Sequence, residues 1–287
     1  MPPKRVGKGL PTYVHTPEMF MNDRVRVEIQ GNLATVTLTR ADKHNGMDLA
    51  MLEAVAAAAK RLKKERRVRT VILRGDGPSF CAGLDFKSVM GNAKAAAKGF
   101  AALWSPVRNR FQDWSMAWRE VPAPVIACIH GNCFGAGIQL ALGADIRIAT
   151  PDAKISVMES KWGLIPDMGG AALLRELVPL DLAKELAMTG RVLSGTEAHA
   201  LGLVGHLADD PLDAAHKLAA EIETRSPDAV AAAKFLMQEA WGGGESHALA
   251  AERRWQRKLL GSRNQRIAVA RNLEKKDLPY GPRRVNA

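Results

Sequence analysis

Two glycine-bearing segments carry the pattern in this chain of 287 residues that is most suggestive of chemistry. They read FCAGLD at residues 80–85 and GNCFGAG at residues 131–137, each between a β-type apolar run and a helical pattern. Glycine lets the backbone approach a ligand closely, and free N–H groups at turns and helix starts can stabilise a developing oxyanion. The two segments therefore predict a site where two backbone N–H groups converge on one oxygen atom.

The elements around these segments predict an α/β fold. Short β-type runs cover residues 25–29, 33–39, 70–73, 125–129 and 145–148. Helical stretches such as residues 49–64 separate them. Strand signals stop after about residue 207, and helical patterns then cover residues 212–224, 227–241 and 245–260. We expect an N-terminal extension at residues 1–22, a core at 23–207 and a helical C-terminal region at 208–287 that mediates oligomerisation.

The charge balance is strongly basic, with 41 Lys and Arg against 30 Asp and Glu and a formal net charge of +11. Such a charge suits nucleic acid, a membrane surface or a phosphate-rich small ligand, and does not choose among them. The basic residues are dispersed, and the basic C-terminal tail has Tyr280 as its one aromatic residue. A stacking platform for nucleic acid is therefore not predicted. Residues 121–143 are apolar, but prolines, glycines and polar residues interrupt them, so we expect no membrane span.

The cysteines and the N-terminus favour a reducing cytoplasm. Cys81, Cys128 and Cys133 show neither metal-ligand spacing nor an even disulfide framework, and the first 22 residues lack the apolar run of a signal peptide. The sequence also lacks a G-x-S-x-G elbow, a Walker loop, a His or Cys metal cluster and the third glycine of a dinucleotide fingerprint. We expect no metal site.

The two glycine segments and their surroundings resemble the crotonase (enoyl-CoA hydratase/isomerase) superfamily. The first continues as FK at residues 86–87 and the second as IQLALGADIRIA at residues 138–149. Further matching segments follow in family order at residues 40–45, 159–170, 189–191, 198–204 and 273–280, so the resemblance covers roughly residues 23–280. It implies a core built as a ββα spiral and a CoA thioester substrate that needs no further cofactor. It also implies C-terminal helices that pack between subunits of a homotrimer or a dimer of trimers.

By position in these motifs, the resemblance places the two oxyanion N–H donors at Leu84 and Ala136 and a catalytic glutamate at Glu159. A thioester oxygen held by two N–H groups acidifies the neighbouring C–H bonds, and one such donor is worth about 3–4 kcal/mol. A carboxylate can move a proton at carbon near neutral pH if an apolar pocket raises its pKa. The alternative interpretations are two tight turns and an ordinary solvated glutamate.

Asp167 and Gln139 complete the catalytic candidates. Asp167 stands eight residues after Glu159, where dienoyl-CoA isomerases have an aspartate and typical hydratases a glycine. Two carboxylates beside an acyl chain can remove a proton at one carbon and return it at another. Asp167 could equally cap a helix at residues 169–177. Gln139 departs from the family, since hydratases usually have glutamate there and dienoyl-CoA isomerases aspartate. An amide cannot transfer a proton near neutral pH, although it can position a substrate or a water molecule.

The resemblance places CoA contacts at Lys43, His44, Ala82, Lys87 and Lys275, with Lys275 reaching CoA across a subunit boundary. The lysines could instead be ordinary solvated charges. We expect an enzyme that shifts a double bond of an enoyl- or dienoyl-CoA through a thioester enolate. An enoyl-CoA hydratase that adds water to a trans-2-enoyl-CoA, and a non-catalytic CoA-ester or RNA-binding protein, are the alternatives.

Overall fold

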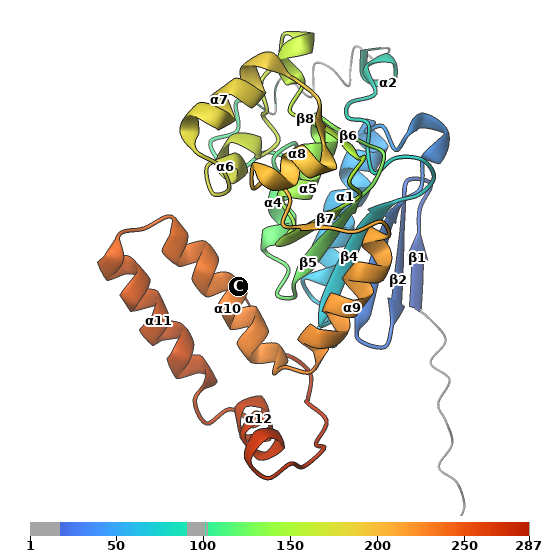
Figure 1. Cartoon of the computed structure of the whole chain (residues 1–287). Helices are drawn as coiled ribbons and strands as arrows, with labels where there is room; N and C mark the ends of the chain where they lie inside the picture. The colour runs from blue at the N-terminus through green and yellow to red at the C-terminus, as the bar shows by residue number, and fades with distance from the viewer. Residues whose placement is uncertain (1–17, 91–100, 102, 287) are drawn as a thin grey trace, which may run out of the picture.

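A seven-stranded sheet forms the centre of the computed structural model, which describes residues 18–90, 101 and 103–286 (Figure 1). Its strands, in sheet order, are β1 (Glu18–Met21), β2 (Val25–Gln30), β3 (Leu33–Leu38), β4 (Thr70–Gly75), β5 (Val125–Ile129), β7 (Ile146–Ala149) and β10 (His206–Leu207). The first three strands pair antiparallel, and the strands from β3 to β10 pair parallel. The sequence runs predicted β2, β3, β4, β5 and β7, because buried strands rich in β-branched residues give a strong local signal.

A second, three-stranded sheet consists of β6 (Asn132–Phe134), β8 (Lys154–Ser156) and β9 (Leu193–Ser194). Strands of two or three residues are too short to show an alternating pattern, and the sequence did not reveal them. β6 contains part of the second glycine segment and lies against the first. Phe134 N–H donates to the Cys81 carbonyl at 3.0 Å, and Cys81 N–H donates to Asn132 at 3.0 Å. These bonds place the two glycine segments side by side.

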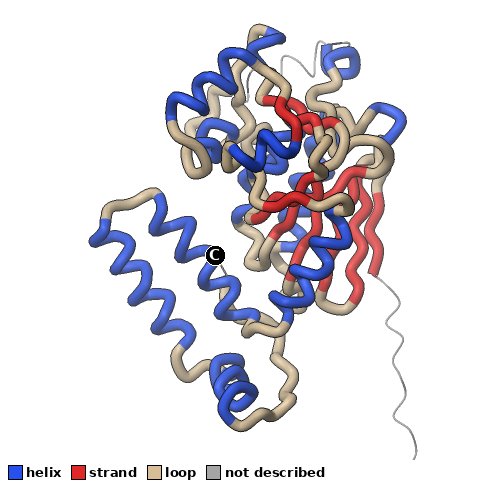
Figure 2. The backbone as a smooth tube through the Cα atoms, in the orientation of Figure 1, coloured by secondary structure: helices blue, strands red, loops and turns tan. Residues whose placement is uncertain are grey.

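Helices pack around the strands and supply the main core. They include α1 (Leu49–Leu62), α4 (Asp113–Arg119), α5 (Ala136–Leu142), α6 (Gly170–Leu174), α7 (Leu180–Thr189) and α8 (Gly195–Ala200). Three short helices, η1 (Ala41–Lys43), α2 (Phe86–Met90) and η2 (Glu159–Trp162), lie in the connections that carry the candidate site residues. Figure 2 shows how these helices and loops gather beyond one end of the parallel strands. Loops that follow parallel strands meet at the same edge of a sheet, so this is where a site is expected.

The helix α9 (Pro211–Glu223) covers the central sheet itself. Ala215 of this helix is buried against Ile72, Ile126 and Ile148 of three adjacent strands. The sequence prediction placed this helix in the C-terminal region, because strand signals had already ended. Its packing joins it to the core.

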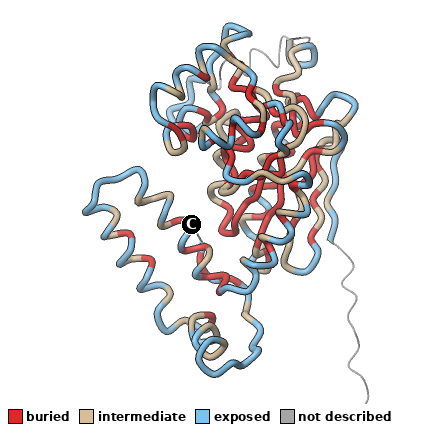
Figure 3. Tube along the Cα trace, viewed as in Figure 1, coloured by how far each residue is buried: buried red, intermediate tan, exposed pale blue. Residues whose placement is uncertain are grey.

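The remaining helices, α10 (Pro227–Trp241), α11 (Glu245–Leu259) and α12 (Arg263–Leu273), form a C-terminal arm beside the core (Figure 1). The arm has its own small apolar cluster, in which the Phe235 and Trp255 rings stack with centroids 5.6 Å apart. Burial is concentrated in the core and sparse in the arm, as Figure 3 shows. Lys234 of α10 ties the arm to the core through an ion pair with Asp145, 2.7 Å between Nζ and Oδ2.

The expected N-terminal extension at residues 1–22 includes a strand. Residues 18–21 of it form β1, which pairs antiparallel with β2, and Phe20 packs against the main core. Residues 1–17 of that expected segment lie outside the described residues. Among the described residues, no helix combines the length and the apolar character needed to cross a membrane.

Candidate active site

The backbone N–H groups of Leu84 and Ala136 are available for a ligand. Neither donates a hydrogen bond within the described part of the chain. Ala136 is the first residue of α5, where a helix leaves its N–H groups unpaired. Gly83 has φ +95°, and a Cβ atom added to it would lie 2.9 Å from the Phe134 carbonyl oxygen and 3.8 Å from Ala136 N. Glycine is therefore what allows the two turns to approach each other.

The start of α5 is held from two sides. Gly137 packs directly on the first turn, since a Cβ atom there would lie 2.1 Å from the Cys81 carbonyl oxygen. On the other side, the indole N–H of Trp114, a fully buried residue of α4, donates to the Ala136 carbonyl at 2.7 Å. No sequence pattern connects Trp114 with this turn, because the contact joins residues 22 positions apart on different helices.

Glu159 is the first residue of η2 and is 8% exposed. Its Oε1 atom accepts a hydrogen bond from Gln139 Nε2 at 2.6 Å, whereas its Oε2 atom is buried and has no partner among the described residues. A Cβ atom on Gly135 would lie 3.3 Å from Oε1, which places the carboxylate beside the second glycine turn. Burial raises the pKa of Glu159 above its ordinary value, although the hydrogen bond from Gln139 acts in the opposite direction.

Gln139 links Glu159 to the start of α6. The Gln139 side chain is 1% exposed, and its Oε1 atom accepts hydrogen bonds from the N–H groups of Met168, at 2.8 Å, and Gly170, at 2.9 Å. Gln139, which stands where the family has a second carboxylate, thus binds directly to the candidate base Glu159. The sequence showed the amide but not this connection.

Asp167 lies next to these contacts and is exposed. It does not cap α6, whose N-cap is Gly169 with φ +89° and no side-chain cap hydrogen bond. The interpretation of Asp167 as a helix cap was wrong, because Gln139 occupies the N–H group at the start of that helix. The surrounding chain desolvates the Asp167 carboxyl enough to raise its pKa, and the Asp167 charge raises the pKa of Glu159 in turn. The two carboxyl groups therefore interact electrostatically.

Two of the predicted CoA contacts adjoin the first turn. Ala82 N–H donates to the His44 carbonyl at 2.9 Å, and His44 Nδ1 lies 3.0 Å from Ser79 Oγ. An Arg40–Asp85 ion pair at 2.8 Å also joins the segment around His44 to the first glycine turn. Hydrogen bonds from Ser88, together with the Arg40 guanidinium, lower the pKa of Asp85 to about 2. The Asp85 carboxyl group is therefore charged at physiological pH.

The predicted lysine contacts are divided between two regions of the molecule. Lys43, on η1, and Lys87, on α2, are exposed near the first turn. Lys275 follows α12, at the end of the arm far from α2 (Figure 1). From there the tail returns to the start of β4, where the Arg69 guanidinium lies 5.2 Å from the centre of the Tyr280 ring. A single copy of the chain thus leaves Lys275 away from the other site residues.

An aromatic pair spans the two catalytic segments. Phe86 begins α2, two residues after Leu84, and Trp162 ends η2, three residues after Glu159. Their ring centroids are 4.4 Å apart, and Trp162 is still 53% exposed. Trp162 therefore provides exposed apolar surface three residues after the candidate base Glu159.

The cysteines do not add a nucleophile to this site. All three are buried and free. Burial raises the pKa of Cys81 and of Cys128 to about 12, so both remain thiols near neutral pH. Within the described residues, no cluster of His, Cys, Asp and Glu side chains is arranged to hold a metal ion.

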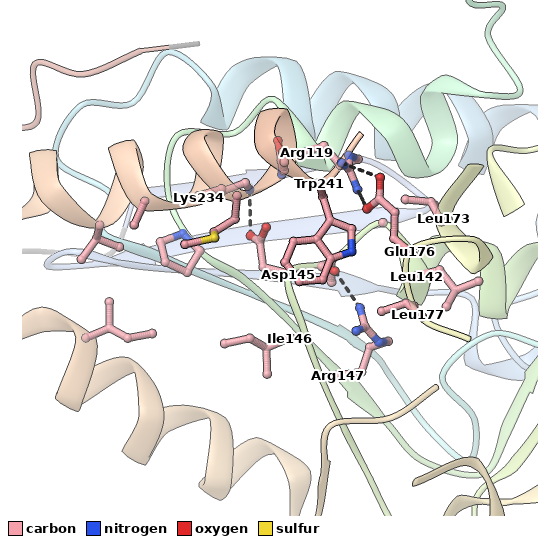
Figure 4. A pocket seen from close by; sticks show the side chains of 18 residues that line it. Arg119, Leu142, Asp145, Ile146, Arg147, Leu173, Glu176, Leu177, Lys234 and Trp241 are labelled. Carbon is pink, nitrogen blue, oxygen red and sulfur yellow. Dashed lines mark hydrogen bonds and ion pairs between the residues drawn. The ribbon is translucent and has the colours of Figure 1, made fainter. Parts of the chain in front are cut away.

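A separate cavity of about 560 Å³ lies between the core and α10 (Figure 4). Lys234, Asp145 and Trp241 line it, and none of the catalytic candidates does. Lys234 pairs there with Asp145, and Arg119 pairs with Glu176 at 2.7 Å, whereas the Arg147 guanidinium donates to the backbone carbonyls of Ala144 and Leu203 at 2.8 Å. This cavity belongs to the junction between the core and the arm.

The sequence model of the enoyl-CoA hydratase/isomerase family matches residues 28–283. The chain belongs to the enoyl-CoA hydratase/isomerase family. Human mitochondrial methylglutaconyl-CoA hydratase is 33% identical over 244 residues, covering 81% of this chain and 70% of that protein. The 1,2-epoxyphenylacetyl-CoA isomerase of Escherichia coli (strain K12) is 30% identical over 262 residues, covering 89% of this chain and 97% of that protein.

Solved structures of this family share the fold. The crystal structure of an enoyl-CoA hydratase from Bacillus anthracis superimposes with a TM-score of 0.82 at 27% identity, over 90% of this chain and 98% of that one. The crotonase-type α/β fold expected from the motifs is thereby confirmed. Family membership also supports an enzyme that acts on acyl-CoA thioesters.

Proposed function

We propose that this enoyl-CoA hydratase/isomerase family member shifts a carbon–carbon double bond of an enoyl- or dienoyl-CoA. The observation that carries the proposal is the buried, unpartnered Oε2 atom of Glu159 beside two unpaired N–H groups. A substrate thioester oxygen would accept hydrogen bonds from Leu84 and Ala136. Glu159 would then remove a proton from carbon, and the electron pair of that C–H bond would move into the conjugated enolate. Return of a proton at the far carbon of the enolate completes the shift with no net change in composition.

Asp167 is the proposed second acid. Its raised pKa lets it hold a proton closer to neutral pH than an ordinary aspartate, and its position at the exposed edge of the site allows exchange with water. Glu159 would thus act on the buried side and Asp167 at the far carbon. Gln139 would position Glu159 without transferring a proton, because an amide does not titrate near neutral pH.

Hydration of a trans-2-enoyl-CoA is the second candidate, and the relatives named as hydratases favour it. In this case Glu159 would be the one base that activates the water molecule, helped by Gln139 or Asp167. If the amide at position 139 limits hydration, Gln139→Glu should increase the rate of hydration sharply. An unchanged rate would contradict the argument that this position separates the two reactions.

A paired assay of the purified protein tests the proposal. One arm follows loss of the enoyl chromophore of a Δ2-enoyl-CoA, and the other follows growth of conjugated Δ2,4 absorbance from a Δ3,5-dienoyl-CoA. We expect dienoyl isomerisation to dominate. Dominant hydration would overturn the isomerase proposal, and silence in both assays would point to another thioester reaction or to binding alone.

Glu159→Gln should abolish turnover while leaving the affinity for the CoA ester nearly unchanged. The matched control is Glu53→Gln, which removes one carboxylate from an exposed position on α1. Retained turnover in the Glu159 variant would refute its assignment as the base. Loss of turnover in both variants would indicate a general defect instead.

A further inference from the structure

We infer that Gln139 is a positioning residue that confines proton transfer by Glu159 to a single atom, Oε2. The inference rests on the proposed function and adds which atom of the base exchanges protons. It concerns a position where this chain departs from the carboxylates usual in its family. Three properties of the site lead to it: the orientation of the amide, the direction of its hydrogen bond to Glu159, and the packing around it.

The orientation of the Gln139 amide is determined by its backbone partners. Backbone N–H groups can only donate, and those of Met168 and Gly170 both point at the same Gln139 atom, at 2.8 and 2.9 Å. That atom must be the carbonyl oxygen, and the two bonds occupy both of its lone pairs. A flipped amide would direct its NH₂ group at the two backbone N–H donors and its oxygen at the Glu159 carboxyl group.

The orientation of the amide then determines where Glu159 carries its proton. With the oxygen directed at α6, the NH₂ group faces Glu159 Oε1 at 2.6 Å. An amide NH₂ group has only donors, so Oε1 must act as an acceptor in every protonation state. A carbonyl oxygen accepts a hydrogen bond more strongly than the hydroxyl oxygen of a carboxylic acid, so the proton of neutral Glu159 favours Oε2, the atom that has no partner among the described residues. The same atom takes up and releases the proton.

Packing prevents the amide from turning away. Gln139 is 1% exposed, and a Cβ atom on Gly170 would lie 2.6 Å from its Oε1 atom. Among the described residues, Asp167 is the titratable group whose charge acts on Glu159, and it raises the pKa of Glu159. The amide is therefore the neutral neighbour that favours the ionised base, and Asp167 is the charged neighbour that opposes it.

A glutamate at position 139 would reverse this arrangement. One of its oxygens could accept the two backbone hydrogen bonds, but the other would face Glu159 Oε1 where the amide now donates at 2.6 Å. Two carboxylates at this separation cannot both be ionised without strong repulsion, so they share a proton and titrate as a pair. Gln139→Glu is thus a nearly isosteric change that removes the fixed donor while retaining the link to α6.

The test compares the pH dependence of isomerisation in the wild-type protein, in Gln139→Glu and in the control Gln256→Glu on the exposed face of α11. In the wild type, ionisation of Glu159 should produce one acid limb. In Gln139→Glu the pair should titrate in two steps, and the step that removes the shared proton should lie about one pH unit or more above the wild-type limb. Gln256→Glu should follow the wild type.

A second readout needs no turnover. Infrared titration of the full-length protein follows ionisation of the Glu159 carboxyl group. Its signal is obtained by subtracting the spectrum of Glu159→Gln from that of the wild type. The same subtraction is then made with both proteins carrying Gln139→Glu. The carboxylate should ionise at higher pH in that background. This measurement distinguishes failure of the inference from failure of the proposed isomerase activity, because it requires no substrate.

Two results would overturn the inference. One is an unchanged Glu159 titration in Gln139→Glu. The other is a rate lowered by the same factor at every pH, which a merely structural role would produce. If Gln139→Glu fails to fold, Gln139→Met is the second variant, because it removes both the NH₂ donor and the carbonyl acceptor of the amide. In folded Gln139→Met the acid limb should still move to higher pH, and an unchanged limb would contradict the role of the amide.

Discussion

At the scale of single residues, the site depends on a carboxylate that the fold makes difficult to ionise. Glu159 is buried next to a neutral amide, and its nearest interacting charge, Asp167, has the same sign. Such surroundings raise the pKa of an acid toward the range in which it can exchange protons with carbon. An ordinary surface glutamate would be ionised too readily for this role.

The raised pKa has a consequence for stability. A buried acid whose pKa is raised costs stability once it ionises, and that cost is absent below its ordinary value of 4.5. The stability of Glu159→Gln relative to wild type should therefore increase from pH 4 to pH 8, by about 1.4 kcal/mol for each unit by which the fold raises the pKa. Thermal or urea unfolding at both pH values measures this difference. A difference that grows as the pH falls would contradict the direction of the pKa change.

At the scale of the elements, the active site depends on two turns that touch through glycine. Gly137→Ala would place a methyl group against the Cys81 carbonyl oxygen, so the two turns would have to separate. We expect kcat to fall by about 10²-fold or more, as for loss of one oxyanion donor, together with lower stability. Gly242→Ala is the matched control, because an added methyl group there meets no atom within 4 Å. Equal activity in the two variants would show that the contact between the turns is not needed.

The helix α10 contributes one attachment of the arm to the core, through Lys234. Lys234 is buried, its pKa is lowered by burial, and its ammonium also donates to the carbonyls of Trp118 and Ala123. Lys234→Met leaves Asp145 without its cation and should lower the free energy of unfolding by about 2–4 kcal/mol. The exposed Lys217–Asp213 pair is the control, and Lys217→Met should cost less than about 0.5 kcal/mol. Denaturant unfolding compares them, and equal costs would show that the buried pair does not anchor the arm.

At the scale of the whole molecule, we expect a homotrimer or a dimer of trimers. The arm exposes large apolar side chains, among them Met237, Trp241, Leu260 and Leu273, which a second copy of the chain could cover. Lys275 can join the CoA site only if copies assemble, because a single chain leaves it at the far end of the arm. Light scattering coupled to size exclusion should give three or six times 31.1 kDa. A stable monomer at micromolar concentration would overturn both the oligomer and the assignment of Lys275 to CoA.

What the sequence determined by itself was the local pattern and the family. Periodic apolar runs predicted the strands from β2 to β7 that form the central sheet and the helices from α9 to α11, because burial of a regular element imposes its period on the residues. The glycine motifs predicted that two turns would approach closely, since glycine marks the places where the chain must turn, and the family resemblance assigned the N–H donors to Leu84 and Ala136. Glu159 and Asp167 followed from the spacing of the family motif.

Tertiary structure alone decided how these residues act on one another. In the sequence, Gln139 is an amide in place of a carboxylate. Only the folded chain shows that its side chain forms hydrogen bonds with both Glu159 and the start of α6. The same is true of Trp114 at the oxyanion turn, and of α9, which belongs to the core. These are contacts between residues far apart in the chain, and a contact of that kind leaves no period or spacing in the sequence from which it could be predicted.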